Sequence, residues 1–505
     1  MPRLPCSSRR GSASAATLAI GLALATAACG SGVQTTDVAV DRTTTTAAAA
    51  DPSDPNAGGP AGTIDFGACD RAVGECGTLA VPLDHDDPDG PTIEVAVARI
   101  PAARPDERIG VLLTNPGGPG ASGIDFALAE PFPQEVLDRF DIIGWDPRGV
   151  GGSEGLRCGA GVDAFLDIDP EPDSAPEQAQ LDAAAQAVAD ECEETDGEIL
   201  PFVGTRDVVR DMDLIREALG EEQISYAGYS YGTALGLGYL EAFPERVRAM
   251  VLDGVVDPTQ DLAGFLLAQG RAIDEQVDAL LDACADDPSC PLDDGGAAYD
   301  RVAVQLDEAP LPGGDGEVGP AELQTGAVFA TYGFNGDDAQ QLWQALADAD
   351  AEDGDGDGIA ALAQQYYDFG GFTSYVAVEC VDSAPPEGSE AWQEFADELV
   401  AVAPRTGASV ANELLPCAFW PAPPSGDPHP VTAPGSPAVL VIGNTGDAAT
   451  PYEQAVEVAE TLADGHLLTL EADGHVGAGR SACVDDASSA YLIDLTLPED
   501  GAVCT

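Results

Sequence analysis

The chain has 505 residues, with 89 acidic and 20 basic side chains and a formal net charge of −69. Every basic residue is an arginine. So acidic a surface repels the phosphates of nucleic acids and of anionic lipids, which excludes nucleic-acid binding and membrane attachment through a basic patch. The length exceeds one average domain and suits an enzyme core with an inserted domain. The chain contains no dinucleotide or P-loop fingerprint.

The N-terminus has the order of a bacterial secretory signal. Arg9 and Arg10 precede the apolar run 15–25, and small residues follow up to Cys29. This order predicts a signal peptide over 1–28 and lipidation of Cys29, with ordinary secretion as the alternative because Thr26 stands where leucine is usual. Residues 29–60, rich in Thr, Ala, Gly and Pro, would form a flexible tether. We therefore expect an exported protein that meets the membrane only through this lipid.

Strand and helix patterns alternate along most of the remaining chain and predict an α/β fold. The first two strands are expected to form an antiparallel pair, whereas later strands alternate with helices, as in a parallel sheet. A mostly parallel eight-stranded sheet is predicted, with strands over 76–83, 92–100, 110–114, 140–145, 223–227, 248–252, 438–442 and 466–471.

Two loops at predicted strand ends carry unusual residues. The loop after the third strand, residues 115–120, contains Gly117, Gly118 and Gly120, whose backbone N–H groups could approach a substrate oxygen without obstruction. A plain Gly/Pro turn is the alternative. Asp146 and Arg148 follow the fourth strand, and we expect them to organise that loop rather than to act on substrate.

Ser230 is the candidate nucleophile. It is the centre of the sequence Gly228-Tyr229-Ser230-Tyr231-Gly232, between a predicted strand and a predicted helix. This is the setting of the G-x-S-x-G elbow, in which two glycines permit a tight turn and the serine hydroxyl is exposed. The N–H of Tyr231, at the start of the helix, is a candidate oxyanion donor.

A serine nucleophile needs a histidine base and usually an orienting carboxylate. The chain has four histidines, and three follow Ser230. His429 lies in a proline-rich stretch and His466 lies at the start of the last predicted strand, so we assign the base to His475, after the carboxyl end of that strand. The acid is assigned to Asp447, after the preceding strand. Asp253 and Asp473 are its competitors.

Between residues 257 and 431 the strand–helix alternation lapses, which predicts an inserted, mainly helical cap between the core segments 61–256 and 432–505. Such a cap would cover Ser230 and select substrates. Glu379 and Asp382 are its candidate substrate-binding residues, because a carboxylate can bind a peptide amine, although surface salt bridging is the common fate of such groups.

The acidic turn 353–358 in the cap resembles the start of a calcium loop. Its twelfth position is Gln364, which cannot supply the bidentate carboxylate, so a solvated turn is the default interpretation. We predict no metal site there or elsewhere.

Cysteine usage also favours export. Without Cys6 and Cys29, ten cysteines remain, an even number that suits five disulfides in an oxidising compartment. The sequence does not fix their connectivity. The simplest pairing joins nearest neighbours, 69–76, 158–192, 284–290, 380–417 and 483–504.

From about residue 69 to 504 the chain resembles the secreted tripeptidyl aminopeptidases of actinomycetes, which are α/β hydrolases related to prolyl aminopeptidases. The resemblance is carried by the Gly-Gly-Pro-Gly loop, the block 145–153, the serine elbow and the segment 474–483. It implies Ser230, Asp447 and His475 as the triad and the N–H groups of Gly118 and Tyr231 as the oxyanion hole. Asn115-Pro116 replaces the histidine that many prolyl aminopeptidases have before this loop, which favours the tripeptidyl branch.

We therefore expect a serine aminopeptidase that works without a cofactor, as a monomer, on peptide substrates. An esterase or lipase with the same triad is the alternative, because both reactions pass through the same tetrahedral oxyanion. A non-catalytic surface binding protein is the third reading, and it is disfavoured by the complete triad.

Overall fold

The computed structural model describes residues 62–69, 73–314, 316–333, 337–368, 371–499 and 501–505. The predicted signal peptide, Cys29 and the tether lie outside the described residues. No helix in the described part of the chain is both long enough and apolar enough to cross a bilayer.

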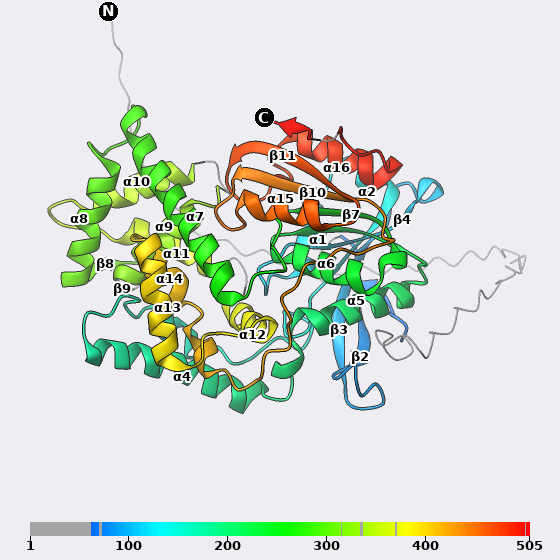
Figure 1. Ribbon diagram of the computed structural model, residues 1–505, viewed down its shortest axis with the longest axis horizontal. Helices are drawn as coiled ribbons and strands as arrows, with labels where there is room; N and C mark the ends of the chain where they lie inside the picture. Colours follow the sequence, from blue (N-terminus) through cyan, green and yellow to red (C-terminus); the bar gives the residue numbers. More distant parts are fainter. Residues whose placement is uncertain (1–61, 70–72, 315, 334–336, 369–370, 500) are drawn as a thin grey trace, which may run out of the picture. The chain divides into compact units, whose positions relative to one another are not determined.

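A twisted sheet forms the core (Figure 1). Its strand order is β1-β2-β3-β5-β4-β6-β7-β10-β11-β12, and the pairs from β5 to β12 are parallel, whereas β1, β2 and β3 join antiparallel. The strands are β1 (Gly67–Ala68), β2 (Glu75–Pro82), β3 (Thr92–Ile100), β4 (Gly110–Asn115), β5 (Phe140–Trp145), β6 (Ile224–Tyr229), β7 (Val247–Asp253), β10 (Val439–Gly446), β11 (Gly465–Asp473) and β12 (Val503–Cys504). All eight predicted strands are present, and the two-residue strands β1 and β12 extend the sheet.

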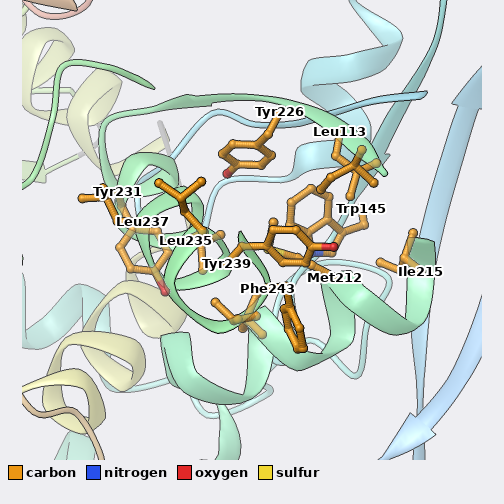
Figure 2. Packing of buried hydrophobic residues seen from close by; sticks show 14 of the residues in the cluster. Leu113, Trp145, Met212, Ile215, Tyr226, Tyr231, Leu235, Leu237, Tyr239 and Phe243 are labelled. Carbon is orange, nitrogen blue, oxygen red and sulfur yellow. The ribbon is translucent and has the colours of Figure 1, made fainter. Parts of the chain in front are cut away.

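Helices cover both faces of the sheet, which is why its central strands are continuously buried rather than alternating. One face packs against α5 and α6, through apolar side chains such as Met212 and Leu235 (Figure 2). The other face packs against α1, α2 and α16. The core helices are α1 (Gly123–Leu128), α2 (Gln134–Arg139), α5 (Thr205–Leu219), α6 (Tyr231–Ala242), α15 (Tyr452–Thr461) and α16 (Ala482–Asp494).

The segment between β7 and β10 is mainly helical, as predicted, and is drawn in green to yellow in Figure 1. It contains α7 (Leu262–Ala283), α8 (Gly295–Glu308), the hairpin β8 (Leu311–Gly313) with β9 (Gly316–Val318), α9 (Pro320–Ala330), α10 (Asp338–Ala349), α11 (Asp357–Asp368), α12 (Phe372–Asp382), α13 (Gly388–Val402), α14 (Gly407–Asn412) and η5 (Leu415–Phe419). Side chains from these elements form a hydrophobic cluster of their own, although part of α12 packs in the sheet cluster instead.

Two earlier helices also belong to this cap cluster. Leu181, Ala185 and Val188 of α4 (Ala175–Asp196) and Phe165 of α3 (Val162–Leu166) pack with the cap helices. α4 has acidic side chains on one face and apolar side chains on the other. The sequence alone therefore shows that the apolar face is buried, but not which element covers it. The cap is thus built from two separate stretches of the chain.

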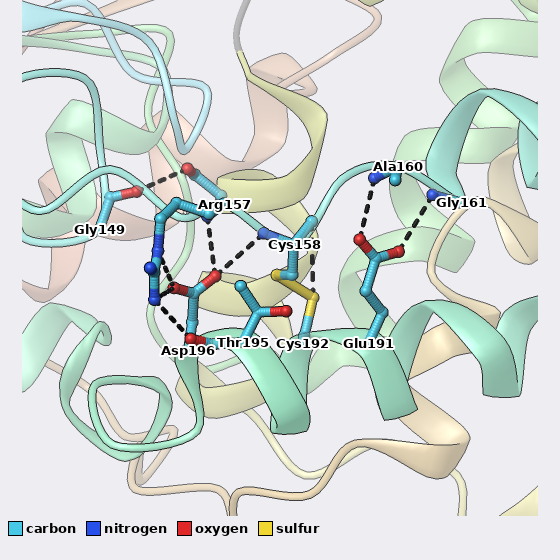
Figure 3. The surroundings of a disulfide bond; sticks show 10 residues. Gly149, Arg157, Cys158, Ala160, Gly161, Glu191, Cys192, Thr195 and Asp196 are labelled. Carbon is cyan, nitrogen blue, oxygen red and sulfur yellow. Dashed lines mark hydrogen bonds and ion pairs between the residues drawn. A yellow bond between two sulfur atoms is a disulfide. The ribbon is translucent and has the colours of Figure 1, made fainter.

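Five disulfides join the nearest-neighbour cysteines, which confirms the simplest predicted pairing. The Cys158–Cys192 bond fastens α4 to the loop after β5, where Asp196 accepts hydrogen bonds from the N–H groups of Arg157 and Cys158 (Figure 3). Cys380–Cys417 ties α12 to η5, and Cys483–Cys504 ties α16 to β12 at the edge of the sheet.

Candidate active site

The three predicted triad residues follow β6, β10 and β11, whose carboxyl ends meet at one edge of the parallel sheet. Ser230 lies between β6 and α6 with φ 54° and ψ −129°, a left-handed conformation that a serine rarely adopts. A Cβ atom at Gly228 would lie 2.4 Å from the Gly232 carbonyl, and one at Gly232 would lie 2.5 Å from the Asn115 carbonyl. The two glycines are therefore required for the tight turn that presents the serine.

His475 and Asp447 form a buried pair. The His475 Nδ1 atom lies 2.9 and 3.0 Å from the two carboxylate oxygens of Asp447. The same carboxylate accepts the N–H groups of Ala449 and Thr450 and the Thr450 hydroxyl, which fix its orientation. On its other side the His475 ring makes an edge contact with the ring of Tyr332, 5.5 Å between centroids. The imidazole is thus held with Nδ1 toward the acid, which leaves Nε2 for proton transfer.

Asp253, the competing acid, does not contact the imidazole through a hydrogen bond. Its fully buried carboxylate accepts the N–H groups of Gly477 and Ala478, two and three residues after His475. Its own carbonyl accepts the N–H of Ser230 at 3.0 Å. Burial raises the pKa of Asp253 to about 6. One residue at the end of β7 therefore fastens both the nucleophile turn and the histidine loop, a role that its position after a strand did not reveal. Asp473, the other competitor, is an exposed residue at the end of β11.

The two predicted oxyanion donors border the same cavity as Ser230. Tyr231 is the first residue of α6, so its N–H has no helical carbonyl to bond. Gly118 has φ 108°, and its N–H donates to no atom of the described residues, whereas the neighbouring Gly117 N–H is already bonded to the Asn115 side chain. Gly117 also packs so closely on the elbow that a Cβ there would lie 2.8 Å from the Ser230 Cβ.

The loop after β5 is organised by the two residues predicted to do so. The Asp146 carboxylate accepts the Ser122 hydroxyl at 2.6 Å and the Gly152 N–H at 2.8 Å. Arg148 is fully buried and makes two hydrogen bonds of 2.7 Å with Asp211. Neither residue lines the cavity that holds Ser230.

The cavity over Ser230 has a volume of about 1490 Å³ and is lined by residues of both the core and the cap. It is larger than the roughly 300–1,000 Å³ of most small-molecule sites. Six aromatic residues of the cap line it: Phe265, Tyr332, Tyr366, Tyr367, Phe372 and Tyr375. Glu379 and Asp382 of α12 also line it, so the structure places both predicted substrate-binding residues in the same cavity as the serine.

The two carboxylates of α12 differ in their partners. Asp382 accepts the Thr205 N–H at 2.7 Å, the Thr205 hydroxyl at 2.6 Å and the Tyr231 hydroxyl at 3.4 Å. The Glu379 carboxyl group accepts no hydrogen bond from the described residues, and burial, with Asp382 and Glu413 nearby, raises its pKa to about 8. A carboxyl group without partners in a partly apolar cavity is available to a cationic ligand.

Glu413 is a third carboxylate of this region, and no sequence pattern had singled it out. It accepts the hydroxyls of Tyr375 at 2.8 Å and Tyr366 at 3.0 Å, and burial raises its pKa to about 7. Both tyrosines line the cavity. Glu413 therefore fixes two aromatic side chains of the cavity wall.

The other histidines lie away from the triad. His85 and Arg148 share the buried carboxylate of Asp211. His429 bonds Glu241 at the cavity rim, and His466 pairs with Asp464 near the opposite end of β11 from His475. In the described part of the chain no group of three His, Cys, Asp or Glu residues could hold a metal ion. In the acidic turn, Asp355 accepts the Asp357 N–H at the start of α11, and Asp357 accepts the Gly314 N–H of the turn between β8 and β9.

Comparison with known proteins identifies similar chains. Residues 110–294 match the α/β hydrolase fold family, and residues 403–504 match the TAP-like protein family. Serine protease Hip1 of Mycobacterium tuberculosis is 36% identical over 460 residues, 85% of this chain and 87% of that protein. Carboxylesterase B of the same species is 35% identical, over 85% and 86% of the two chains. The tripeptidyl aminopeptidase of Streptomyces lividans is 34% identical, over 83% and 81%.

Proposed function

Because the chain belongs to the α/β-hydrolase family that contains Hip1 and the Streptomyces tripeptidyl aminopeptidases, and is a serine hydrolase, we propose that it removes tripeptides from the free N-termini of peptides. The observation that carries this proposal is the unpartnered Glu379 carboxyl group in the cavity that also holds Ser230. A free N-terminal amine is the cation that such a group would bind. The size of the cavity also suits an oligopeptide better than a small ester.

In the proposed reaction Ser230 attacks the carbonyl carbon of the third residue while His475 accepts the hydroxyl proton. The N–H groups of Gly118 and Tyr231 stabilise the oxyanion, and Asp447 stabilises the imidazolium. The C–N bond then breaks, His475 gives its proton to the leaving amine, and an acyl-enzyme remains. Water, deprotonated by His475, hydrolyses that ester and releases the tripeptide and the serine.

We assign the two α12 carboxylates different roles in this reaction. Asp382 holds the start of α5 and the Tyr231 side chain, because all its hydrogen bonds go to Thr205 and Tyr231. Glu379 binds the substrate amine, since its carboxyl group has no competing partner among the described residues. Glu379 and its aromatic neighbours therefore form the amine-binding wall.

A carboxylesterase is the second candidate, favoured by the 35% identity with a protein named carboxylesterase B. A panel of chromogenic substrates separates the two: free and N-acetylated mono-, di- and tripeptide p-nitroanilides, and simple p-nitrophenyl esters. Preference for the free tripeptide supports the aminopeptidase, and ester turnover alone rejects it. Ser230→Ala is the matched control and removes all turnover through the triad.

Export and lipidation remain part of the proposal. They are supported by the signal-like order of residues 1–28 and by five disulfides, which persist in oxidising compartments. Metabolic labelling with a fatty acid tests lipidation: the full chain incorporates label, and Cys29→Ala does not. Unlabelled protein in the culture medium would instead indicate ordinary secretion. A monomer is proposed as the working state, and light scattering tests it.

A further inference from the structure

Arg480 lies on the loop that carries His475, and it lines the same cavity. Its guanidinium is held by backbone carbonyls: Nη2 donates to the Asp473 carbonyl at 2.6 Å, and Nη1 donates to the carbonyls of His475 and Val476 at 3.3 and 3.4 Å. Three carbonyls thus orient a planar cation without neutralising its charge.

Two glycines make room for this guanidinium. A Cβ atom at Gly474 would lie 2.4 Å from Nη1 of Arg480, and one at Gly333 would lie 3.2 Å from Nη2. Both glycines have positive φ, 96° and 68°, so side chains are disfavoured there on two grounds. The guanidinium therefore occupies a fitted position rather than an arbitrary one on the surface.

The charge of Arg480 is unusual for this protein. Acidic residues outnumber basic ones 89 to 20, and most described arginines lie within 4 Å of a carboxylate. The other arginines of the cavity, Arg206 and Arg210, both pair with Asp86. Arg480 has no carboxylate of the described residues within salt-bridge distance. It is thus a positive charge that the protein has left available at the cavity wall.

The position of Arg480 indicates which part of a substrate it would meet. His475 protonates the leaving amine, so the leaving segment lies on the histidine side of Ser230. Tyr332 packs against the His475 ring, and the next residue, Gly333, packs against the Arg480 guanidinium. Arg480 therefore lies next to the histidine loop, whereas Glu379, proposed for the substrate amine, is on α12 of the cap.

We propose that Arg480 binds a carboxylate of the leaving segment, an inference that rests on the proposed peptidase function. A guanidinium forms paired hydrogen bonds with a carboxylate, and its carbonyl partners leave N–H groups free for this. The carboxylate is either the C-terminus of a one-residue leaving segment or an acidic side chain. With a cation site for the amine and an anion site beyond the cleaved bond, the cavity is complementary to short peptides that carry opposite charges at their two ends.

The test uses two matched substrate pairs: Ala-Ala-Ala-Ala as the free acid and as the C-terminal amide, and Ala-Ala-Ala-Glu amide with Ala-Ala-Ala-Gln amide. Release of Ala-Ala-Ala is measured for the wild type, Arg480→Gln and the control Arg271→Gln. Arg271 is exposed on α7, outside the cavity, and likewise has no carboxylate partner among the described residues. The readout is the ratio of kcat/KM within each pair, so a general loss from disturbing the loop cancels.

We expect the wild type and Arg271→Gln to prefer the carboxylate member of one pair by about tenfold to a hundredfold, and Arg480→Gln to lose that preference. Loss of the acid-to-amide ratio identifies the C-terminal carboxylate, and loss of the Glu-to-Gln ratio identifies the side chain. Tripeptide release with neither preference, or with a preference that survives Arg480→Gln, overturns the inference alone. No tripeptide release from any peptide or from Ala-Ala-Ala p-nitroanilide overturns the proposed function and the inference with it.

Discussion

Asp253 connects the two partners of the proposed proton transfer, because its carbonyl binds the nucleophile turn and its carboxylate binds the histidine loop. Asparagine at this position keeps the carbonyl but offers only one side-chain oxygen to two N–H groups. We expect Asp253→Asn to lower kcat about tenfold to a hundredfold with little change in KM, since the histidine loop shifts while the cap does not. Steady-state kinetics on a tripeptide p-nitroanilide measure this. An increase in KM at constant kcat would contradict the positioning role.

Glu379 and Asp382 are carboxylates on one helix with different partners. Neutralising each in turn separates binding of the substrate amine from stabilisation of the cavity wall. At about pH 8, where the Glu379 carboxyl group can ionise, we expect Glu379→Gln to raise KM for free-amine peptides about tenfold or more and to leave N-acetylated esters unaffected. Because the pKa of Glu379 is raised to about 8, KM for free amines should rise as pH falls below that value and the carboxyl group binds its proton. Asp382→Asn should instead lower the melting temperature and affect both substrate types. Equal effects of Glu379→Gln on free and blocked substrates would exclude the amine site.

At the scale of elements, α12 packs both in the cap cluster and in the cluster between the sheet and helices α5 and α6. Its residues Phe372, Tyr375, Glu379 and Asp382 follow helical spacing and line the cavity. The remaining faces are divided: Val376 and Cys380 pack in the cap cluster, and Ala377, Val378 and Val381 pack in the sheet cluster. A displacement of α12 would therefore change both the cavity wall and its attachment to the core.

The Cys380–Cys417 bond is the covalent restraint on this helix. We expect the double substitution Cys380→Ala/Cys417→Ala to lower stability by about 2–5 kcal/mol and to raise KM for free-amine peptides several-fold, since α12 loses its attachment to η5. The control is Cys284→Ala/Cys290→Ala, a short-loop disulfide outside the cavity, which should lower the melting temperature without changing KM. Calorimetry and kinetics measure the two effects. An unchanged KM in the first variant would show that α12 is held by packing alone.

The elements also show what the sequence could predict. The eight strands, and the position of Ser230, Asp447 and His475 after the carboxyl ends of strands, were predictable because apolar runs, strand ends and the glycines around Ser230 are local signals. The nearest-neighbour pairing of the cysteines was also correct, although two of the five bonds join residues 34 and 37 positions apart. The packing of α4 on the cap, the clamp by Asp253 and the position of Glu413 depend on contacts between residues more than thirty positions apart, which no local pattern encodes.

For the whole molecule, several buried carboxyl groups hold protons that the unfolded chain would release. Burial raises the pKa of Asp253 and Asp382 to about 6, of Glu413 to about 7 and of Glu379 to about 8. The native state therefore binds more protons than the unfolded state between about pH 4 and 8, so its free energy of unfolding falls as pH rises through that window. The net charge of −69 acts in the same direction, since repulsion grows as acids ionise.

We accordingly expect a higher melting temperature at about pH 5.5 than at about pH 8. Thermal unfolding monitored by calorimetry measures this difference. Glu379→Gln should reduce the fall in melting temperature at the high-pH end of this range, because it removes the carboxyl group whose pKa is raised to the highest value. A melting temperature that increases from pH 5.5 to 8 would contradict this assignment.

The backbone conformation of Ser230, φ 54° and ψ −129°, presents the nucleophile but destabilises the folded state. Such a conformation costs a non-glycine residue about 1–3 kcal/mol, and only glycine adopts it freely. Ser230→Gly and Ser230→Ala both lack the hydroxyl and should both be inactive. Ser230→Gly should nevertheless melt at a higher temperature, because alanine keeps a Cβ atom in the strained backbone conformation. Calorimetry of the two inactive proteins measures this difference directly. If Ser230→Gly is the more stable protein, selection for stability alone would be expected to replace this serine before other residues, and so to abolish catalysis.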